Sequence, residues 1–242
     1  MGLIRGPNIV RSGLILHLDA ALPASYPGSG TVWYDTSGNG NNGTLTNGPT
    51  FNSSNGGNIL FDGTNDYVSF ASTTVGSFNN STFSFGVWFY FNGLSQLKTL
   101  FSKRNDDPFN QYSMGISDDI QNGTSGTKLG VFLNPDSGNS SLWNNLNYSL
   151  PYTGWHYGMC VVNTTVQTMY LNGVSVASGN KNYTGYTFNI VNRPLYVAAT
   201  NQNNNPVNFF GSNIAIVSLY SRSLTANEVL QNFNALRGRF RI

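Results

Sequence analysis

Residues Thr82–Phe91 read TFSFGVWFYF, and this stretch decides the fold class. Phenylalanine or valine stands at every odd position from Phe83 to Phe91, and Trp88 is among the residues between them. Because side chains alternate between the two faces of a strand, this period of two predicts a strand with one strongly apolar face. Aromatic residues make up 14% of the 242-residue chain and charged residues only 9%, so apolar burial rather than ion-pair networks must stabilise it.

Further segments with the same period extend over most of the chain, separated by clusters of Gly, Asn, Ser and Pro that are typical of turns. The predicted strands are Gly13–Asp19, Asn58–Asp62, Tyr67–Phe70, Leu97–Lys103, Tyr112–Ile116, Lys128–Leu133, Trp155–Val162, Gln167–Leu171, Val174–Ala177, Leu195–Ala199 and Asn213–Tyr220. Asn172-Gly173 favours a tight hairpin turn. These short strands predict an all-β chain, a two-sheet antiparallel β-sandwich of the jelly-roll kind.

One helix is predicted near the end of the chain. Thr225 and Glu228 have the spacing of a capping box, and Val229, Phe233 and Leu236 form an apolar stripe at helical spacing. The predicted organisation is therefore an N-terminal arm (1–12), a jelly-roll domain that closes with this short helix (13–236), and a basic C-terminal tail (237–242).

Several segments in order resemble the concanavalin A-like, laminin-G-like jelly-roll domains. They are Gly13–Asp19 (GLILHLD), Trp33–Leu45 (WYDTSGNGNNGTL), Ile59–Val68 (ILFDGTNDYV), Phe83–Trp88, Trp155–Tyr157 with Tyr170–Gly173, and Ile216–Val229. The resemblance covers residues 13–236 and implies the fold. It says less about function, because this fold hosts lectins, adhesion modules and glucanases.

The variant with Asp19-Ala20-Ala21 and Trp33-Tyr34-Asp35 is most similar to copies in structural proteins of marine tailed bacteriophages. This implies a non-enzymatic virion structural or decoration protein on the particle surface. Its expected partners are other capsid or tail proteins and, through the lectin-like jelly roll, host-surface glycans. The alternatives are a carbohydrate-binding adhesion module, either in a phage tail or extracellular, and, more remotely, a glycan hydrolase. A homo-oligomer stays open.

Composition excludes two other classes of partner. The formal net charge of +2 is too small to favour nucleic acid. No apolar run approaches the roughly 20 residues of a membrane span, so no membrane insertion is expected. Cys160 is the only cysteine, which rules out an intrachain disulfide, and its apolar surroundings predict a buried thiol.

Catalytic residues are not expected. Glucanases of this fold use paired carboxylates on one strand face, but Glu228 is the only glutamate and the capping box already accounts for it. Asp106-Asp107 and Asp118-Asp119 are adjacent pairs, whose side chains would point to opposite faces of a strand. The two histidines, His17 and His156, lie within predicted strands and are expected to be packed there.

Carbohydrate binding usually combines an aromatic ring with amides and backbone groups. Trp143, Asn144 and Asn145 lie in a polar segment with no alternation, which predicts an exposed loop with a tryptophan available to a sugar. Tyr183 and Tyr186 lie in a similar segment. The alternative is that these rings cap the edge of the sandwich. Trp33, Trp88 and Trp155 lie in the fold signature and are expected in the core.

Two oxygen-rich turns are candidate Ca²⁺ sites, and a structural Ca²⁺ ion is the one cofactor that the sequence suggests. The first contains Asp35, Asn39 and Asn41, and the second contains Asp62 and Asp66. Carboxylate and amide oxygens are the ligands that this ion prefers. The alternative is that both are turns held by hydrogen bonds from side chain to backbone.

The termini are candidate docking elements. Five of the twelve basic residues lie in them, which leaves seven basic against ten acidic residues in the body. The candidates are Arg5, Arg11, Arg237, Arg239, Phe240 and Arg241. On this hypothesis, removing residues 1–10 and 238–242 leaves the jelly roll folded but abolishes attachment to a partner. The alternative is two solvated tails.

Overall fold

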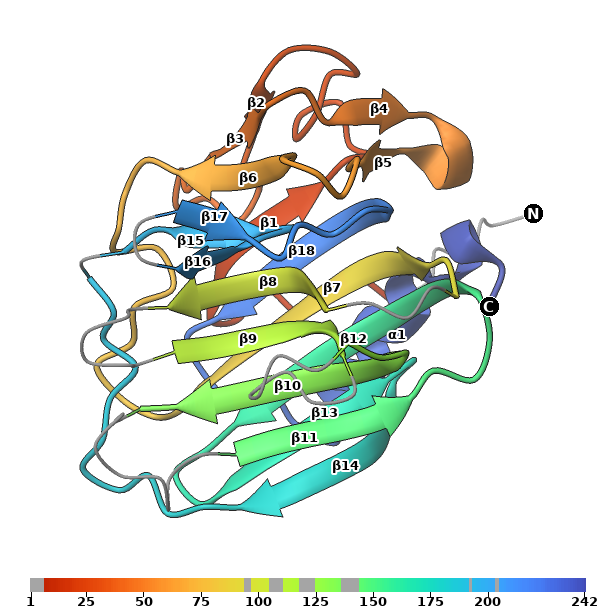
Figure 1. The fold of residues 1–242 in the computed structure, drawn as a ribbon. Coiled ribbons are helices and arrows are strands. Elements are labelled where there is room, and N and C mark those ends of the chain that lie inside the picture. The colour runs from red at the N-terminus through yellow and green to blue at the C-terminus, as the bar shows by residue number, and fades with distance from the viewer. Residues whose placement is uncertain are drawn as a thin grey trace.

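The computed structural model describes residues 7–93, 97–104, 111–117, 125–135, 144–191, 193–202 and 205–242. They form two stacked antiparallel sheets with one helix on the outside (Figure 1). The back sheet contains β1 (Leu14–Asp19), β4 (Thr50–Asn52), β5 (Asn58–Leu60), β7 (Phe83–Phe91), β12 (Gly154–Val162), β13 (Val166–Leu171), β14 (Val174–Asn180) and β18 (Asn213–Tyr220). The front sheet contains β2 (Val32–Trp33), β3 (Gly43–Thr46), β6 (Tyr67–Phe70), β8 (Lys98–Arg104), β9 (Gln111–Ile116), β10 (Lys128–Asn134), β11 (Asn144–Ser149) and β15 (Leu195–Val197).

The order of the strands confirms the predicted sandwich. The back sheet runs β14-β13-β12-β7-β18-β5-β4, with β1 also paired to β18, and the front sheet runs β11-β10-β9-β8-β15-β6-β3-β2. A small hairpin of β16 (Thr200–Gln202) and β17 (Asn205–Val207), a short 3-10 turn η1 (Ser54–Gly56) and the helix α1 (Ala226–Phe240) complete the described elements. The hairpin predicted at Asn172-Gly173 joins β13 to β14, with φ of 51° and 82° at these two residues.

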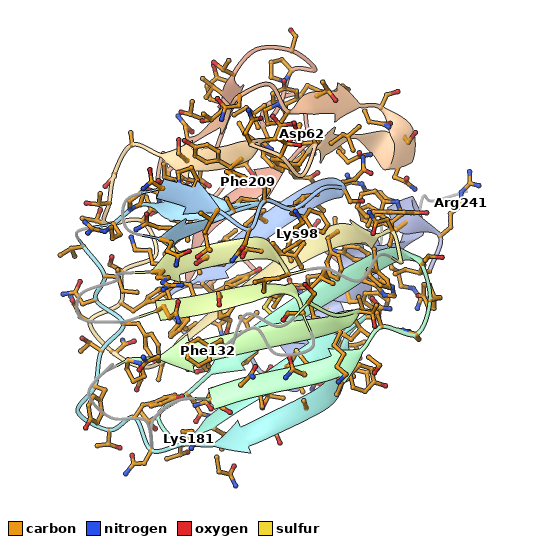
Figure 2. The ribbon with its side chains drawn as sticks, in the orientation of Figure 1. Asp62, Lys98, Phe132, Lys181, Phe209 and Arg241 are labelled. Carbon is orange, nitrogen blue, oxygen red and sulfur yellow. The ribbon has the colours of Figure 1, made fainter. Side chains whose placement is uncertain are left out.

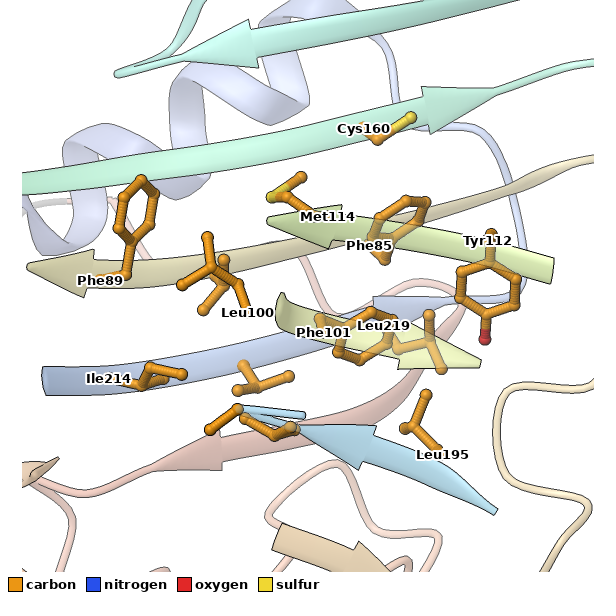
Figure 3. Packing of buried hydrophobic residues seen from close by; sticks show 14 of the residues in the cluster. Phe85, Phe89, Leu100, Phe101, Tyr112, Met114, Cys160, Leu195, Ile214 and Leu219 are labelled. Atoms are coloured by element: carbon orange, nitrogen blue, oxygen red, sulfur yellow. The ribbon is translucent and has the colours of Figure 1, made fainter. Parts of the chain in front are cut away.

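The apolar face of β7 decides how the sheets pack, as its alternation predicts. Phe83, Phe85 and Phe89 point between the sheets and are fully buried. The Phe85 ring stacks on Phe101 of β8, with centroids 5.5 Å apart, and Tyr112 of β9 lies beside both rings, at 5.2 and 5.9 Å (Figure 3). Burying one such side chain contributes about 2–3 kcal/mol.

The other face of β7 is buried under α1. Thr225 and Glu228 form the predicted capping box, so the helix begins at Ala226. Its apolar stripe then covers Trp88, whose ring is stacked on Phe233 at 5.7 Å and on Phe240 at 4.2 Å. The back sheet is therefore buried on both sides where it meets α1, whereas no helix covers the outer face of the front sheet in the described residues, and the β16–β17 hairpin covers only a part of that face.

The predicted boundary between helix and tail at residue 237 is wrong, because α1 continues to Phe240. The Phe240 side chain is 4% exposed. The guanidinium of Arg239 donates to both carboxylate oxygens of Asp19, at 2.8 and 2.9 Å, and to the backbone oxygens of Asn55 and Gly57. Arg239 and Phe240 are thus part of the fold, and they are not available to a partner.

The N-terminal arm also contacts the helix. The amide of Val10 donates to Asn232 Oδ1 at 2.8 Å, and its carbonyl accepts from the Tyr220 hydroxyl at 3.1 Å. Gln231 Nε2 donates to the carbonyl of Asn8. The described part of the arm is therefore held on the jelly roll rather than solvated.

The remaining docking candidates lie nearer the surface. Arg5 lies outside the described residues. Arg11 is exposed and donates to the Thr36 carbonyl at 3.1 Å, and the Arg237 guanidinium lies over the Phe233 ring. Arg241 follows α1 in a left-handed conformation. Their docking to a partner stays a prediction.

A buried lysine joins three segments of the chain at the front sheet. Lys103 of β8 is fully buried, and its ammonium donates to the carbonyls of Thr73, Val75 and Arg193 at 2.5, 2.8 and 2.9 Å. Burial lowers the pKa of Lys103 to about 7. The three carbonyl acceptors match the three N–H groups of the ammonium form, which they favour.

Cys160 should be unreactive in the native protein. It is fully buried in β12 between the sheets, as predicted, and burial raises the pKa of its thiol. A thiol reagent added in native buffer should therefore label no measurable fraction within an hour, whereas the unfolded chain should be labelled completely. Mass spectrometry of the intact protein checks this, and rapid native labelling would contradict the placement of Cys160.

Candidate functional site

The outer face of the front sheet carries an aromatic cluster. In β6, Val68 and Phe70 point into the core, so Tyr67 points outward, and the same alternation in β15 turns Tyr196 outward. Their rings meet edge to face with centroids 5.2 Å apart, and Phe209 lies 6.2 Å from Tyr67. Tyr67 and Phe209 are half-buried, which leaves part of each ring open on this face. Figure 2 looks onto the front sheet and labels Phe209.

A small polar cavity lies beside these rings, where the β16–β17 hairpin crosses β8. Thr200 of the hairpin is hydrogen-bonded to Ser102 at 2.8 Å, and a bridge between Thr99 and Phe209 fixes the following loop. The cavity of about 40 Å³ is lined by Leu97, Thr99, Arg104, Gln111, Ser113, Thr200 and Asn208. That volume holds a few water molecules and is too small for a sugar ring. A ring would have to lie on the aromatic cluster and send only a hydroxyl into the cavity.

The hairpin also buries an unsatisfied amide. Asn201 is 2% exposed, and neither its Oδ1 nor its Nδ2 has a hydrogen-bond partner within the described residues. A buried amide without partners costs about 1–3 kcal/mol and needs an explanation, such as a bound water or ligand group. We call the aromatic cluster and the cavity together the front-face site.

The sequence-predicted sugar residues do not assemble into a site. Trp143 lies outside the described residues. Asn144 and Asn145 lie in β11 rather than in a loop, and the buried Asn144 side chain donates to Gln167. Tyr183 is fully buried, with its ring 5.7 Å from that of Phe188, so it has no open face for a sugar.

Tyr186 is half-buried and packs against the core cluster between the sheets. For Tyr183 and Tyr186 the structure therefore favours the alternative in which the rings close the edge of the sandwich. Trp33, Trp88 and Trp155 are buried, as predicted.

The first oxygen-rich turn is held by hydrogen bonds. Asp35 Oδ1 accepts from the amides of His17 and Ser37, and Oδ2 accepts from the Ser37 hydroxyl and the Asn41 amide, all within 3.0 Å. The side-chain amides of Asn39 and Asn41 donate to carbonyls of β1. These groups fasten the turn to β1, which agrees with the alternative of a hydrogen-bonded turn, and Ca²⁺ binding by Asp35, Asn39 and Asn41 stays a prediction.

The second turn keeps free carboxylate oxygens. Asp62 Oδ1 accepts from the amides of Thr64, Asn65 and Asp66, and the Thr64 bond is the main cause that lowers the pKa of Asp62. Asp66 Oδ2 accepts from the Asp62 amide, and burial raises the pKa of Asp66. Both residues line a cavity of about 280 Å³. Within the described ranges, no three His, Cys, Asp or Glu side chains gather around one point.

Ca²⁺ binding by Asp62 and Asp66 also stays a prediction. We predict that Ca²⁺ at ten times its dissociation constant raises the melting temperature by about 3 °C, and that a chelator reverses the rise. Asp62→Asn should remove the effect, and Asp35→Asn should lower the melting temperature without removing the Ca²⁺-dependent rise. Identical melts with chelator and with Ca²⁺ would argue against an ion here.

Glu228 is engaged in the fold. Besides capping α1, its carboxylate pairs with both terminal nitrogens of Arg222, at 2.5 and 2.9 Å, and this pair is the main cause that lowers the pKa of Glu228 to about 2. It therefore stays ionised near neutral pH and cannot donate a proton to a leaving group. In the part of the chain that the structure describes, no helix has the length and hydropathy of a membrane span.

Comparisons with known proteins agree with this architecture. Domain 4 of AbnA, an extracellular arabinanase from Geobacillus stearothermophilus solved with arabinotriose, has a TM-score of 0.65 and 18% identity, over 92% of this chain and 98% of that one. The binding domain of Paraclostridial Mosquitocidal Protein 1 has a TM-score of 0.69 and 16% identity over 93% of this chain. The binding domain of Botulinum neurotoxin DC, in complex with SialylT, has a TM-score of 0.68 and 14% identity over 94%. At these identities the likeness shows the fold alone.

The chain spans about half, 52%, of each of the two toxin binding domains. No curated protein matches the sequence. The sequence pattern of the concanavalin A-like lectin/glucanases superfamily matches residues 62–230, which run from the second oxygen-rich turn into α1. Since that match covers most of the chain and the structure has a lectin-like two-sheet jelly roll, the chain belongs to the concanavalin A-like lectin/glucanase superfamily.

Proposed function

We propose that this chain is a non-catalytic module that binds carbohydrate at the front-face site. The observation that carries the proposal is an aromatic cluster next to a polar cavity: Tyr67 and Phe209 are half-buried, and the buried Tyr196 packs edge to face on Tyr67. Similar structures support it, because their descriptions name glycan ligands: arabinotriose for the arabinanase domain and gangliosides for Botulinum neurotoxin type C.

The aromatic residues and the polar cavity would contact different parts of the sugar. The apolar face of a sugar ring would lie on the exposed parts of Tyr67 and Phe209. These two side chains would lose little conformational entropy on binding, because their neighbours already fix them. One hydroxyl would enter the cavity, where Gln111 and Asn208 offer amide groups and Arg104 offers N–H donors.

Two of the carboxylates support a non-catalytic role. A glycosidase needs a carboxylic acid that can donate a proton beside a second carboxylate. The only glutamate of the chain is held ionised by Arg222. The buried Asp19 is held by Arg239, so neither Glu228 nor Asp19 is free to act as the proton donor.

A glycan array followed by titration calorimetry tests the proposal. We expect at least one glycan to bind. Tyr67→Ala and Phe209→Ala should each weaken the affinity about tenfold, because each removes one partly exposed ring of the aromatic cluster. Tyr148→Ala is the matched control, since Tyr148 is 39% exposed on β11 at the edge of the same sheet. The proposal fails if no glycan binds, or if the control weakens binding as much as the two site variants.

For the setting of the module, we propose the surface of a phage particle, with an extracellular adhesin as the alternative. The support is the resemblance of the stretch from Asp19 to Asp35 to copies in marine phage structural proteins. Mass spectrometry of purified particles should find the chain in a fixed ratio to the capsid protein, and antibody labelling should place it outside. Particles that lack it, with the chain recovered free from the medium, would favour the extracellular alternative.

A further inference from the structure

A second groove lies on the other side of the molecule, where the N-terminal arm, β1 and α1 meet. Its volume is about 430 Å³, within the range of small-ligand sites of roughly 300–1,000 Å³. Ile9, Leu22 and Leu236 supply apolar walls, and Arg11, His17 and Asp19 supply polar groups. We call it the arm groove. It shares no lining residue with the front-face site.

His17 is a buried polar side chain that lines this groove with one nitrogen unused. It is 2% exposed, and its Nδ1 is hydrogen-bonded to Ser218 Oγ at 3.0 Å. No hydrogen bond from a described residue reaches Nε2. The groups that influence the ring are Asp19, Arg11, Asp35 and Arg239, and burial is the main cause that lowers the pKa of His17 to about 4. At neutral pH the imidazole is therefore uncharged, and its Nε2 can share a hydrogen bond with a ligand hydroxyl.

The charges of the groove leave one cation without a counter-ion. The carboxylate of Asp19 is neutralised by Arg239, whose Nη1 lies 2.8 and 2.9 Å from its oxygens. Arg11 is exposed and spends one N–H on the Thr36 carbonyl, so the rest of its guanidinium fork can pair with an anion. The groove thus combines one guanidinium for a carboxylate, one neutral imidazole for a hydroxyl, and aliphatic walls.

From this combination we infer that the arm groove binds an acidic sugar, a pyranose that carries a carboxylate. The carboxylate would pair with Arg11, a ring hydroxyl would bond to His17 Nε2, and the apolar face of the ring would lie against Leu22 and Leu236. A neutral sugar lacks the charge for Arg11, and an aliphatic acid lacks the hydroxyl for His17. The inference does not depend on the front-face site.

Nuclear magnetic resonance of the two histidines tests it on the intact chain. The sequence has only His17 and His156, and His156 does not line the groove, so its ring signal is an internal control. D-glucuronate titrated to tens of millimolar should shift the His17 ring signals in a saturable way and leave His156 unchanged. D-glucose and hexanoate, the matched neutral sugar and aliphatic acid, should bind at least tenfold more weakly.

Two variants locate the binding. Arg11→Gln keeps donors but removes the charge, and it should weaken glucuronate at least tenfold, whereas Arg237→Gln, exposed on α1 outside the groove, should not. Ala235→Phe should fill the groove and abolish the His17 shift, and an unchanged circular dichroism spectrum and urea midpoint would show that this variant is folded. The inference is overturned if glucuronate leaves His17 unshifted, if hexanoate binds as tightly, or if Tyr67→Ala rather than Arg11→Gln removes the binding. The first two outcomes leave the proposed function to its own test, and the third would move the acidic sugar to the front-face site.

Discussion

Phe240→Ala should lower the free energy of unfolding by about 3–5 kcal/mol, the largest loss expected from one substitution in α1. The Phe240 ring is 4% exposed and lies 4.2 Å from the Trp88 ring and 4.7 Å from the Trp155 ring. Its removal leaves a cavity between helix and back sheet that neither indole can fill without moving the strand that carries it. Urea unfolding followed by tryptophan fluorescence measures the loss.

Leu230→Ala is the matched control, because Leu230 lies on the same helix and is 42% exposed. It should change the free energy of unfolding by less than about 1 kcal/mol. Truncation after Gly238 should be at least as damaging as Phe240→Ala, since it also removes the Arg239 bonds to Asp19. This reverses the expectation that the jelly roll tolerates loss of residues 238–242. A truncated chain with an unchanged urea midpoint would show that the helix end does not stabilise the sandwich.

Lys103→Met should cost about 3 kcal/mol. The methionine keeps much of the aliphatic stem, but the carbonyls of Thr73, Val75 and Arg193 lose their shared donor inside the protein. These carbonyls belong to two loops that the Lys103 ammonium joins to β8. Without the ammonium the loops should open more often, so the neighbouring amides should lose protection from hydrogen exchange. An unchanged stability with unchanged exchange would mean that water replaces the ammonium without cost.

The same lysine makes stability depend on pH. Its pKa is about 7 in the folded chain and 10.5 in its ordinary state, so between these values the unfolded chain binds more protons than the folded chain. Stability contributed by this group therefore rises as the pH increases from 7 to 10.5, and is lowest below pH 7. The wild type should become more stable relative to Lys103→Met across this window. Parallel pH profiles of the two proteins would contradict a lowered pKa.

The sandwich could be predicted because the patterns that specify its strands and turns lie within short segments of the sequence. The alternation in Thr82–Phe91 assigns one face of β7 to the core, and Asn172-Gly173 sets a hairpin turn, whatever the rest of the chain does. The strand order could not be read in the same way, since β7 lies between β12 and β18, which follow it at unequal distances along the chain.

The wrong predictions for Phe240 and Asn144 have one cause: the groups that hold these residues lie far from them in sequence or are hard to see in the pattern. Phe240 continues the apolar stripe of α1, but Gly238 and the arginines around it are typical of a helix end. The last turn is stabilised by the contact of Phe240 with Trp88, which is distant in sequence. Asn144 alternates with Leu142 and Leu146, but the polar residues around them hide this period, and the strand becomes evident only where β10 pairs with β11.

The front-face site was missed for the same reason. Tyr67 and Tyr196 each occupy an outward position of a predicted strand, which is a usable signal for exposure. They meet only because β15 pairs with β6, although the two strands are more than a hundred residues apart in sequence. A search for outward aromatic residues in all predicted strands would have found both rings, but not their contact.

The pairing of β1 with β18 has a consequence for the time course of biosynthesis. Leu14 is opposite Tyr220 and His17 is opposite Ser218, so β1 can pair only after β18 has been synthesised, about 200 residues later. At about 5–20 residues per second this delay is roughly 10–40 s, during which the edge of β1 and the apolar side of the nascent sheet have no native cover. Nascent chains arrested before residue 213 should therefore be digested by protease and recruit chaperones, whereas chains released after residue 240 should acquire resistance within seconds.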